Sequence, residues 1–256
     1  MKRKRRERIK VVIISPKTDQ VFKLKISPVE TDQIILQAKI LQDEKDITHK
    51  VDILWKLRLS WEATYKTYQT LQEISANPAK TTFETGGVLR IRASVTIDGR
   101  EWSARTKVNI IGANPGKEQL MKELDSDLLR AQAFLESSWK QFDDNRFPLV
   151  NPDSSMRGIM QISEHWWGEK SSLPLKDFNR ISWQWDYNIK TAKLILDDYY
   201  KQARRAFPGE SERKIQDRML KAYKLGPNFK YKTDPSRYPY VQKIRDYVKK
   251  KPWLKN

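Results

Sequence analysis

The sequence contains no cysteine, and its only histidines are His49 and His165, in a chain of 256 residues. The lack of thiols excludes a disulfide framework and thiolate metal sites. So few histidines disfavour zinc chemistry and a Ser-His catalytic triad. A chain without cysteine fits a reducing compartment, and it fits equally well an exported protein that needs no bridges. We therefore expect neither a metal nor another cofactor.

Long apolar runs are also missing. Residues 1–10 carry seven basic side chains, and the apolar run that follows, residues 11–14, is interrupted at once by Pro16 and Lys17. That run is far shorter than the hydrophobic region of a signal peptide. No other run is long enough to cross a bilayer. We expect a protein without a membrane span and without an export signal in this chain.

The charge balance is strongly basic, with 50 Lys and Arg against 32 Asp and Glu and a net charge of +18 at pH 7. Such a field favours polyanionic partners. Nucleic acid is the weaker candidate, because the basic residues are spread along the chain and no reading motif is present. Residues 1–10 are interpreted as a solvated basic tail. The alternative is an electrostatic anchor to an anionic surface.

Residues 11–111 alternate between apolar and polar side chains, which is typical of strands with one buried face. The clearest alternating runs are 34–40, 53–61, 89–95 and 102–110. Asp98-Gly99 predicts a two-residue hairpin turn between the last two runs. Several short strands joined by turns indicate an immunoglobulin-like β-sandwich without the usual disulfide, with Trp55 as its core tryptophan.

Residues 112–117, rich in Gly, Asn and Pro, interrupt both periodicities and are interpreted as a linker. Beyond them the apolar spacing of three and four residues predicts helices. The expected helices are 117–137, 188–206, 211–224 and 240–250. The chain as a whole is therefore expected to be an α+β protein of two domains.

The first of these helices carries the most informative carboxylate. Its apolar face ends at Glu136, and a polar loop then leads to the apolar turn Gly158-Ile159-Met160-Gln161. An apolar wall around a carboxyl disfavours the charged form and raises its pKa. A carboxyl at a helix end facing such a turn has the character of a buried general acid.

Several segments, taken in order, resemble the soluble lytic transglycosylases. They are Glu136-Ser137, Gly158-Ile159-Met160-Gln161, Asn188-Ile189, Ala222-Tyr223-Lys224-Leu225-Gly226 and Tyr240-Val241. The resemblance covers about residues 118–248, half of the chain. It implies a lysozyme-like α-helical domain over 118–256, following the immunoglobulin-like domain at 11–111.

The resemblance also implies a reaction and a set of site residues. Glu136 would protonate the bridging oxygen between N-acetylmuramic acid and N-acetylglucosamine, and would then take the proton of the C6 hydroxyl. The product would be a 1,6-anhydro sugar formed without water. Substrate contacts are expected from Ser155, Met160, Gln161, Tyr223 and Tyr240. Each of these has a structural alternative, as a turn serine, a core methionine, a backbone-bonded amide or a core tyrosine.

Two departures from the family pattern stand out. Lys224 occupies the place of the family's asparagine, where it could meet a carboxylate of the substrate, and Ser155-Met156 replaces a Gly-Ala pair. Asp143, Asp144 and Asp153 are interpreted as turn formers. If one of them activated water, the protein would be a hydrolase resembling goose lysozyme.

A third interpretation is a catalytically inactive protein that binds or assembles on the cell wall. The partners expected in every case are peptidoglycan glycan strands, with anionic wall polymers or phage structural proteins as further candidates. We expect a monomer that acts at the bacterial wall. The missing export signal favours a phage-encoded or virion-associated origin.

Overall fold

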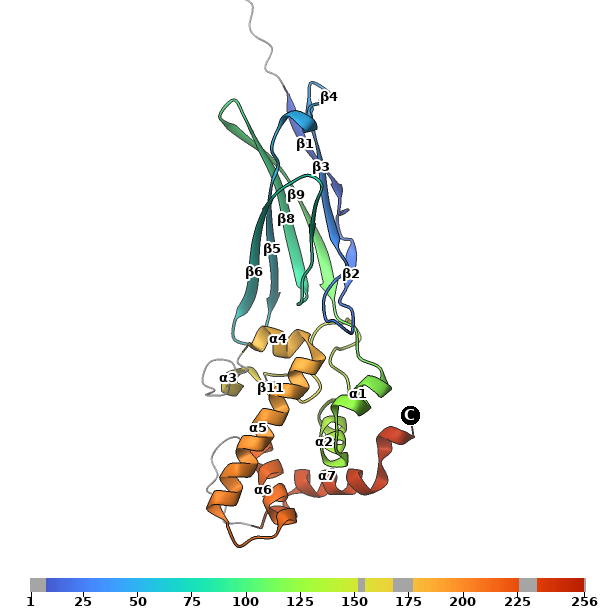
Figure 1. The fold of residues 1–256 in the computed structure, drawn as a ribbon, viewed down its shortest axis with the longest axis vertical. Helices are drawn as coiled ribbons and strands as arrows, with labels where there is room; N and C mark the ends of the chain where they lie inside the picture. Colours follow the sequence, from blue (N-terminus) through green and yellow to red (C-terminus); the bar gives the residue numbers. More distant parts are fainter. Residues whose placement is uncertain (1–7, 152–154, 168–176, 226–233, 256) are drawn as a thin grey trace, which may run out of the picture. The chain divides into compact units, whose positions relative to one another are not determined.

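The computed structural model describes residues 8–151, 155–167, 177–225 and 234–255, which fold as a mixed α+β protein (Figure 1). The α+β class expected from the sequence is confirmed. The chain divides into two compact units, Met1–Ala113 and Asn114–Asn256. The division falls inside the segment 112–117.

The first unit consists of two sheets. One sheet holds β1 (Ile9–Ser15), β3 (Ile34–Gln42), β4 (Lys45–Asp46) and β7 (Ala79–Thr81). The other has five strands in the order β2 (Val21–Lys23), β9 (Arg100–Ile111), β8 (Gly87–Ile97), β5 (Leu54–Glu62) and β6 (Thr67–Ser75). β2 runs parallel to β9, and the neighbours in the rest of this sheet are antiparallel.

The alternation read from the sequence is confirmed in the core of this unit. The inward-facing apolar residues of the runs 34–40, 53–61 and 89–95 are buried, whereas Ile35, on the opposite face of β3, is 46% exposed. Trp55 is fully buried, and its indole N–H donates to the carbonyl of Ala76 at 2.9 Å. Asp98 and Gly99 both have positive φ, +50° and +71°, and connect the paired residues Ile97 and Arg100 as the predicted hairpin turn.

Two features of this unit differ from the prediction: the residue at which the first strand begins, and an additional strand at the edge of the five-stranded sheet. Strand β1 begins at Ile9, so the last residues of the predicted tail 1–10 belong to a sheet. Strand β6 was not predicted. Its Leu71 is 71% exposed, so the strand has no strong apolar face from which to read a period of two.

Side chains complete the hydrogen bonding along one edge of β3. Its residues 34–36 pair with β7, and residues 41 and 42 pair with β4. Between these strands, Ala38 donates its N–H to Asn77 Oδ1, and Asn77 Nδ2 donates to the Ala38 carbonyl, both at 2.9 Å. The N–H of Ile40 donates to Thr48 Oγ1 at 2.9 Å. Backbone groups that lie between two short strands are therefore not left unpaired.

The second unit is mainly helical. Its helices are α1 (Lys117–Glu123), α2 (Asp127–Ser137), α3 (Glu164–Trp167), α4 (Phe178–Trp183), α5 (Trp185–Ala206), α6 (Glu212–Leu225) and α7 (Pro239–Lys250). A short hairpin, β10 (Met156–Arg157) with β11 (Ile162–Ser163), lies among them. The 3-10 turns are Thr48–Lys50 in the first unit and Pro235–Arg237 and Pro252–Leu254 in the second.

The single helix predicted over 117–137 is in fact two helices. The apolar spacing continues through Leu124, which is fully buried, but helix α1 ends there. Ser126 then caps the start of α2, because its hydroxyl accepts the N–H of Leu129. A serine side chain satisfies an otherwise free helical N–H, which favours a new start at this position. Helices α5, α6 and α7 agree closely with the predicted ranges.

Packing within this unit brings the end of α2 toward two other helices. α2 packs on α7, and α6 packs on both α5 and α7. The buried residues of α5 recur at Ile189, Ala192, Ile195 and Tyr199, a helical spacing. Among the residues that the structure describes, no helix combines the length and apolarity needed to cross a bilayer.

Replacing Asn77 by alanine should weaken the edge of β3 locally. Ala38 would lose partners for its N–H and its carbonyl, at a cost of about 2 kcal/mol for the two groups. Hydrogen exchange should then show a faster-exchanging Ala38 amide and lower stability of β3. Gln37→Ala, on an exposed position of the same strand, is the control. Equal protection of Ala38 in both variants would contradict this account.

Candidate functional site

The last turn of α2 carries Glu136 into the interior of the second unit. The helix ends at Ser138, which is left-handed with φ +53°. The Glu136 side chain is only 5% exposed. Its Oε1 accepts the hydroxyl of Tyr240 at 2.5 Å, and its Oε2 lies 3.7 Å from Lys224 Nζ. One carboxylate is thus held by α7 on one oxygen and by α6 on the other.

The protonation of Glu136 reflects opposing influences. Burial raises its pKa above the ordinary glutamate value, while the Lys224 ammonium and the hydrogen bond from Tyr240 lower it. Burial is the largest influence, so the pKa stays raised. The folded protein therefore favours the protonated carboxyl more than water does. That is the state from which an acid can give a proton.

Two tyrosines surround this carboxyl. Burial and the charge of Glu136 raise the pKa of Tyr223 and of Tyr240 well above the usual tyrosine range, so both hydroxyls stay protonated. Gln132 lies one helical turn before Glu136, and both polar atoms of its buried side chain lack a hydrogen-bond partner among the described residues. Tyr223 donates its hydroxyl to the carbonyl of Met160 at 2.7 Å. This bond links α6 to the apolar turn.

The apolar turn, residues 158–161, connects β10 to β11, and two buried amide side chains form hydrogen bonds with its backbone. Gln141 Oε1 accepts the N–H of Ile159 at 3.0 Å, and Gln141 Nε2 donates to the Ser182 carbonyl at 2.7 Å. Asn188 Oδ1 accepts the N–H of Met160 at 2.9 Å. The backbone of the turn is therefore fixed by side chains from the loop after α2 and from α5.

Gly158 is required where the turn meets these two amides. Its φ is +76°, and a Cβ at this position would lie 2.5 Å from Asn188 Nδ2 and 2.6 Å from Gln141 Oε1. Any side chain would force the supporting amides to move. The glycine thus serves the close approach of the backbone to the amides as well as the left-handed conformation.

Gln161 ends the turn in a conformation that few side chains adopt, with φ +48°. Its side chain is buried, and its Nε2 donates to the Gly158 carbonyl at 2.8 Å. Its Oε1 has no hydrogen-bond partner among the residues that the structure describes. A buried acceptor without a partner is costly. This oxygen is therefore an acceptor whose hydrogen-bonding capacity is unused within the described part of the chain.

The predicted site residues do not all meet at the carboxyl. Met160 is fully buried, and the contact that connects it to the site is made by its backbone carbonyl. The Ser155 hydroxyl lies 3.5 Å from that of Ser163, and within the described part of the chain it makes no hydrogen bond to Glu136. The structure thus joins Glu136 directly to Tyr240 and, through charge, to Tyr223.

The aspartates of the loop behave as the sequence indicated where they can be followed. Asp143 Oδ1 accepts the N–H of Phe147 at 2.9 Å, as a turn former does. Asp144 is fully exposed and lies 3.7 Å from Lys140. Asp153 lies outside the described residues.

Sequence reasoning missed one contact and two residues. Lys224 was considered as a partner for a substrate carboxylate, and its pairing with Glu136 was not predicted. Its ammonium lies 3.7 Å from Glu136 Oε2 and 5.4 Å from the centre of the Tyr240 ring. Gln132 and Gln141 were not considered. The four-residue spacing between Gln132 and Glu136 could have indicated a shared face. A single glutamine in a polar loop gives no such signal for Gln141.

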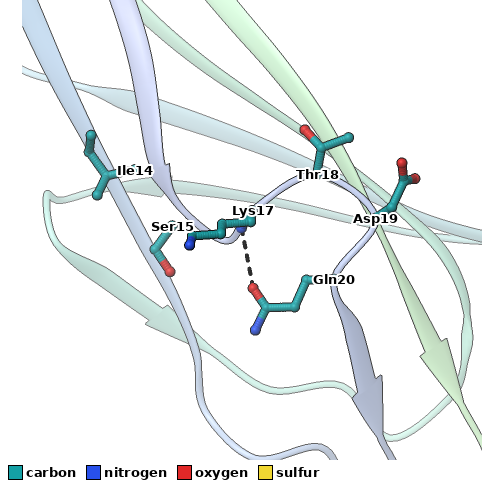
Figure 2. Close-up of a pocket in the computed structure, with 6 residues that line it drawn as sticks. All are labelled: Ile14, Ser15, Lys17, Thr18, Asp19 and Gln20. Atoms are coloured by element: carbon teal, nitrogen blue, oxygen red, sulfur yellow. Dashed lines mark hydrogen bonds between the residues drawn. The ribbon is translucent and has the colours of Figure 1, made fainter.

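Other kinds of site are less developed. In the described ranges no three His, Asp or Glu side chains gather in a way that could hold a metal ion. Figure 2 shows a hollow in the first unit lined by Ile14, Ser15, Lys17, Thr18, Asp19 and Gln20. Its walls come from one continuous turn, in which the Lys17 N–H donates to Gln20 Oε1 at 3.2 Å. None of the predicted site residues belongs to it.

No family model, curated protein or solved structure matches this chain. The assignment of a function therefore depends on the motifs and on the geometry around Glu136.

Replacing Lys224 by methionine should raise the pKa of Glu136 further, because the attraction of the ammonium for the carboxylate is lost. A pH titration of the glutamate side-chain carbonyl by carbon-13 NMR measures this directly. Lys214→Met, which removes an exposed cation from the same helix, should leave the titration unchanged. A Glu136 pKa that stays constant or falls in Lys224→Met would refute the electrostatic description.

Replacing Gly158 by alanine should destabilise the protein by about 3 kcal/mol or more, from backbone strain and from displaced buried hydrogen bonds. Gly209→Ala is the matched control, since a Cβ there has open space around it. Urea denaturation of the two variants compares the costs. Similar free energies of unfolding would show that the amide support of the turn is unimportant.

Proposed function

We propose that this protein is a peptidoglycan lytic transglycosylase, with a lysozyme-like second unit that carries Glu136 as the catalytic acid and base. The observation that carries the proposal is the surroundings of Glu136. A buried carboxyl with a raised pKa is contacted by Tyr240 and Lys224, and Tyr223 beside it bonds to the apolar turn. These are the segments on which the resemblance to the family rests.

The first step needs a proton at the glycosidic oxygen. The raised pKa of Glu136 keeps a proton on the carboxyl at pH values where an exposed glutamate is largely ionised. The proton moves from Glu136 to the bridging oxygen as the C1–O bond breaks. Positive charge then develops on the muramic ring, and the new carboxylate partly balances it.

The second step needs a base at the same place. After the first transfer, the Lys224 ammonium and the Tyr240 hydroxyl stabilise the carboxylate of Glu136. The carboxylate takes the proton of the muramic C6 hydroxyl while that oxygen bonds to C1. Because the nucleophile belongs to the same sugar, proximity replaces a second carboxylate and no water is consumed. Gln161 Oε1 is suited to hold a donor of the substrate during both steps.

Hydrolysis is the alternative that has an observation of its own. Hydrolases of this general kind commonly use a second carboxyl to activate water. Glu164, at the start of α3, is buried and follows directly on the hairpin that carries the turn. Among the described residues, Lys224 is the charged side chain that shifts the pKa of Glu136, and no carboxylate contributes to that shift. This favours the transglycosylase reaction over a hydrolase resembling goose lysozyme.

The first unit is proposed to be an immunoglobulin-like docking module. Two features support this: the facing of two sheets over a common core, and a first segment whose strands β1 and β2 join different sheets. A docking role fits a wall-degrading enzyme that is carried to its substrate, for example as part of a virion.

Replacing Glu136 by glutamine should reduce turnover of purified peptidoglycan by about a thousandfold or more, because the amide can neither give nor take the proton. Mass spectrometry of the wild-type digest should find 1,6-anhydromuramic ends. The variant should remain folded, since an amide avoids the cost of a buried charge above the glutamate pKa.

Glu164→Gln distinguishes the two reactions. A transglycosylase should keep its product and most of its rate in this variant, whereas a hydrolase that uses Glu164 should lose activity. Reducing muramic ends from the wild-type enzyme would reject the transglycosylase, and unchanged turnover in Glu136→Gln would reject the site itself.

A further inference from the structure

The outer face of the five-stranded sheet carries basic side chains directly opposite one another. The register aligns Arg58 with Arg90, and Arg90 with Lys107. One step along the strands, Lys56 is aligned with Arg92, and Arg92 with Arg105. We call these six residues the basic face. They occupy three adjacent strands, β5, β8 and β9, in two consecutive rows.

Acidic side chains pair with three of the six cations of the basic face, one of which, Arg92, lies on the central strand β8. Glu73 on β6 pairs with Lys56 at 3.1 Å, Glu101 pairs with Arg92 at 2.9 Å, and Asp19 pairs with Lys107 at 3.4 Å. The remaining three cations are not neutralised in the part of the chain that the structure describes. Arg90 donates to the Ser60 hydroxyl at 2.9 Å, and Arg58 and Arg105 are exposed without an ion pair.

This arrangement is unfavourable for the sheet alone. Like charges directly opposite across neighbouring strands destabilise the pair. The strands are about 5 Å apart and successive outward residues are about 7 Å apart, so each cation has like neighbours well inside a Debye length. A solvated surface of mixed signs would avoid this repulsion. The repulsion is relieved when an anionic chain lies across the rows.

We propose that the basic face binds a linear polyphosphodiester of the bacterial wall, of the poly(glycerol phosphate) type. The ligand lies across β5, β8 and β9, with its phosphates between the two rows of cations. The polyanionic character of the ligand follows from residues of the first unit, and the choice of a wall polymer rests on the proposed function. The proposal gives that unit a partner chemistry.

Nucleic acid fits the same face less well. Sheets that read single-stranded RNA carry aromatic rings on which bases stack, and the two basic rows contain none. The adjoining rows, through Ser60 and through Ser94, also lack aromatic residues. A flat sheet face cannot follow the major groove as a helix or a two-stranded ribbon does. Phosphate charge without base contacts is what this surface recognises.

The test measures binding of the full chain to purified poly(glycerol phosphate) over a series of salt concentrations. By analogy with single-stranded polyanions, six phosphate contacts predict a log–log slope of about 4. The variant Arg58→Gln/Arg105→Gln should lower this slope by about 1.4 and weaken binding on the order of tenfold at low salt. Neither side chain has a described hydrogen bond, so the fold should be retained.

The matched control is Lys39→Gln/Lys80→Gln, which removes the same charge from the exposed face of the other sheet. It should bind almost as the wild type does. Equal weakening in both variants would mean that net charge alone drives binding, and the proposal would fall. A single-stranded DNA with the same number of phosphates should bind more weakly than the wall polymer. If DNA binds as tightly through Arg58 and Arg105, the face is a nucleic-acid site instead.

Discussion

The chemistry proposed for the second unit depends on the withdrawal of one carboxyl from water. Burial pushes Glu136 toward its neutral form, and Lys224 and Tyr240 push it back toward its ionised form. Neither influence alone would serve an acid that must become a base. Without Lys224 and Tyr240, the buried carboxyl would hold its proton too firmly to act as an acid. If the Lys224 ammonium outweighed the effect of burial, the carboxyl would be ionised before the substrate bound. The balance is set by the distance between side chains of α2, α6 and α7.

The site also includes the turn at residues 158–161, whose backbone is fixed by polar side chains as well as by apolar packing. The turn at 158–161 is held by the amides of Gln141 and Asn188, and it is tied to α6 by Tyr223. Buried amides with complete hydrogen bonds fix a backbone more specifically than methyl groups can. Gln161 departs from this pattern, since its buried oxygen lacks a partner. Among the described residues, Gln132 departs from it as well, because both polar atoms of its buried side chain lack a partner. Unpartnered buried atoms of this kind indicate where a ligand would bond.

The sequence predicted what local patterns encode and missed what distant contacts decide. Glu136 was selected because its motif stands in order with the other motifs of the family. Its burial could be predicted because it ends the apolar face of a helix. The break before Ser126 was missed because the apolar spacing continues across it. Gln141 could not be predicted, since its bonds reach residues about forty positions away in the chain. Strand β6 was missed because Leu71 faces water, and the pairing of Lys224 with Glu136 was missed because the two residues lie on different helices.

Basic residues have different roles in the two units, and the role of each depends on the charges of its neighbours. In the second unit, Lys224 lies beside a buried acid, so its charge acts within the protein. In the first unit, Arg58 and Arg105 are held near other cations by strand register, and the acidic side chains pair with other members of the basic face. Register is fixed by the buried faces of the same strands, because a slip of one residue would expose the core. The core that stabilises the sheet therefore also enforces the repulsion on its outer face, and the anionic partner proposed for this face would relieve it.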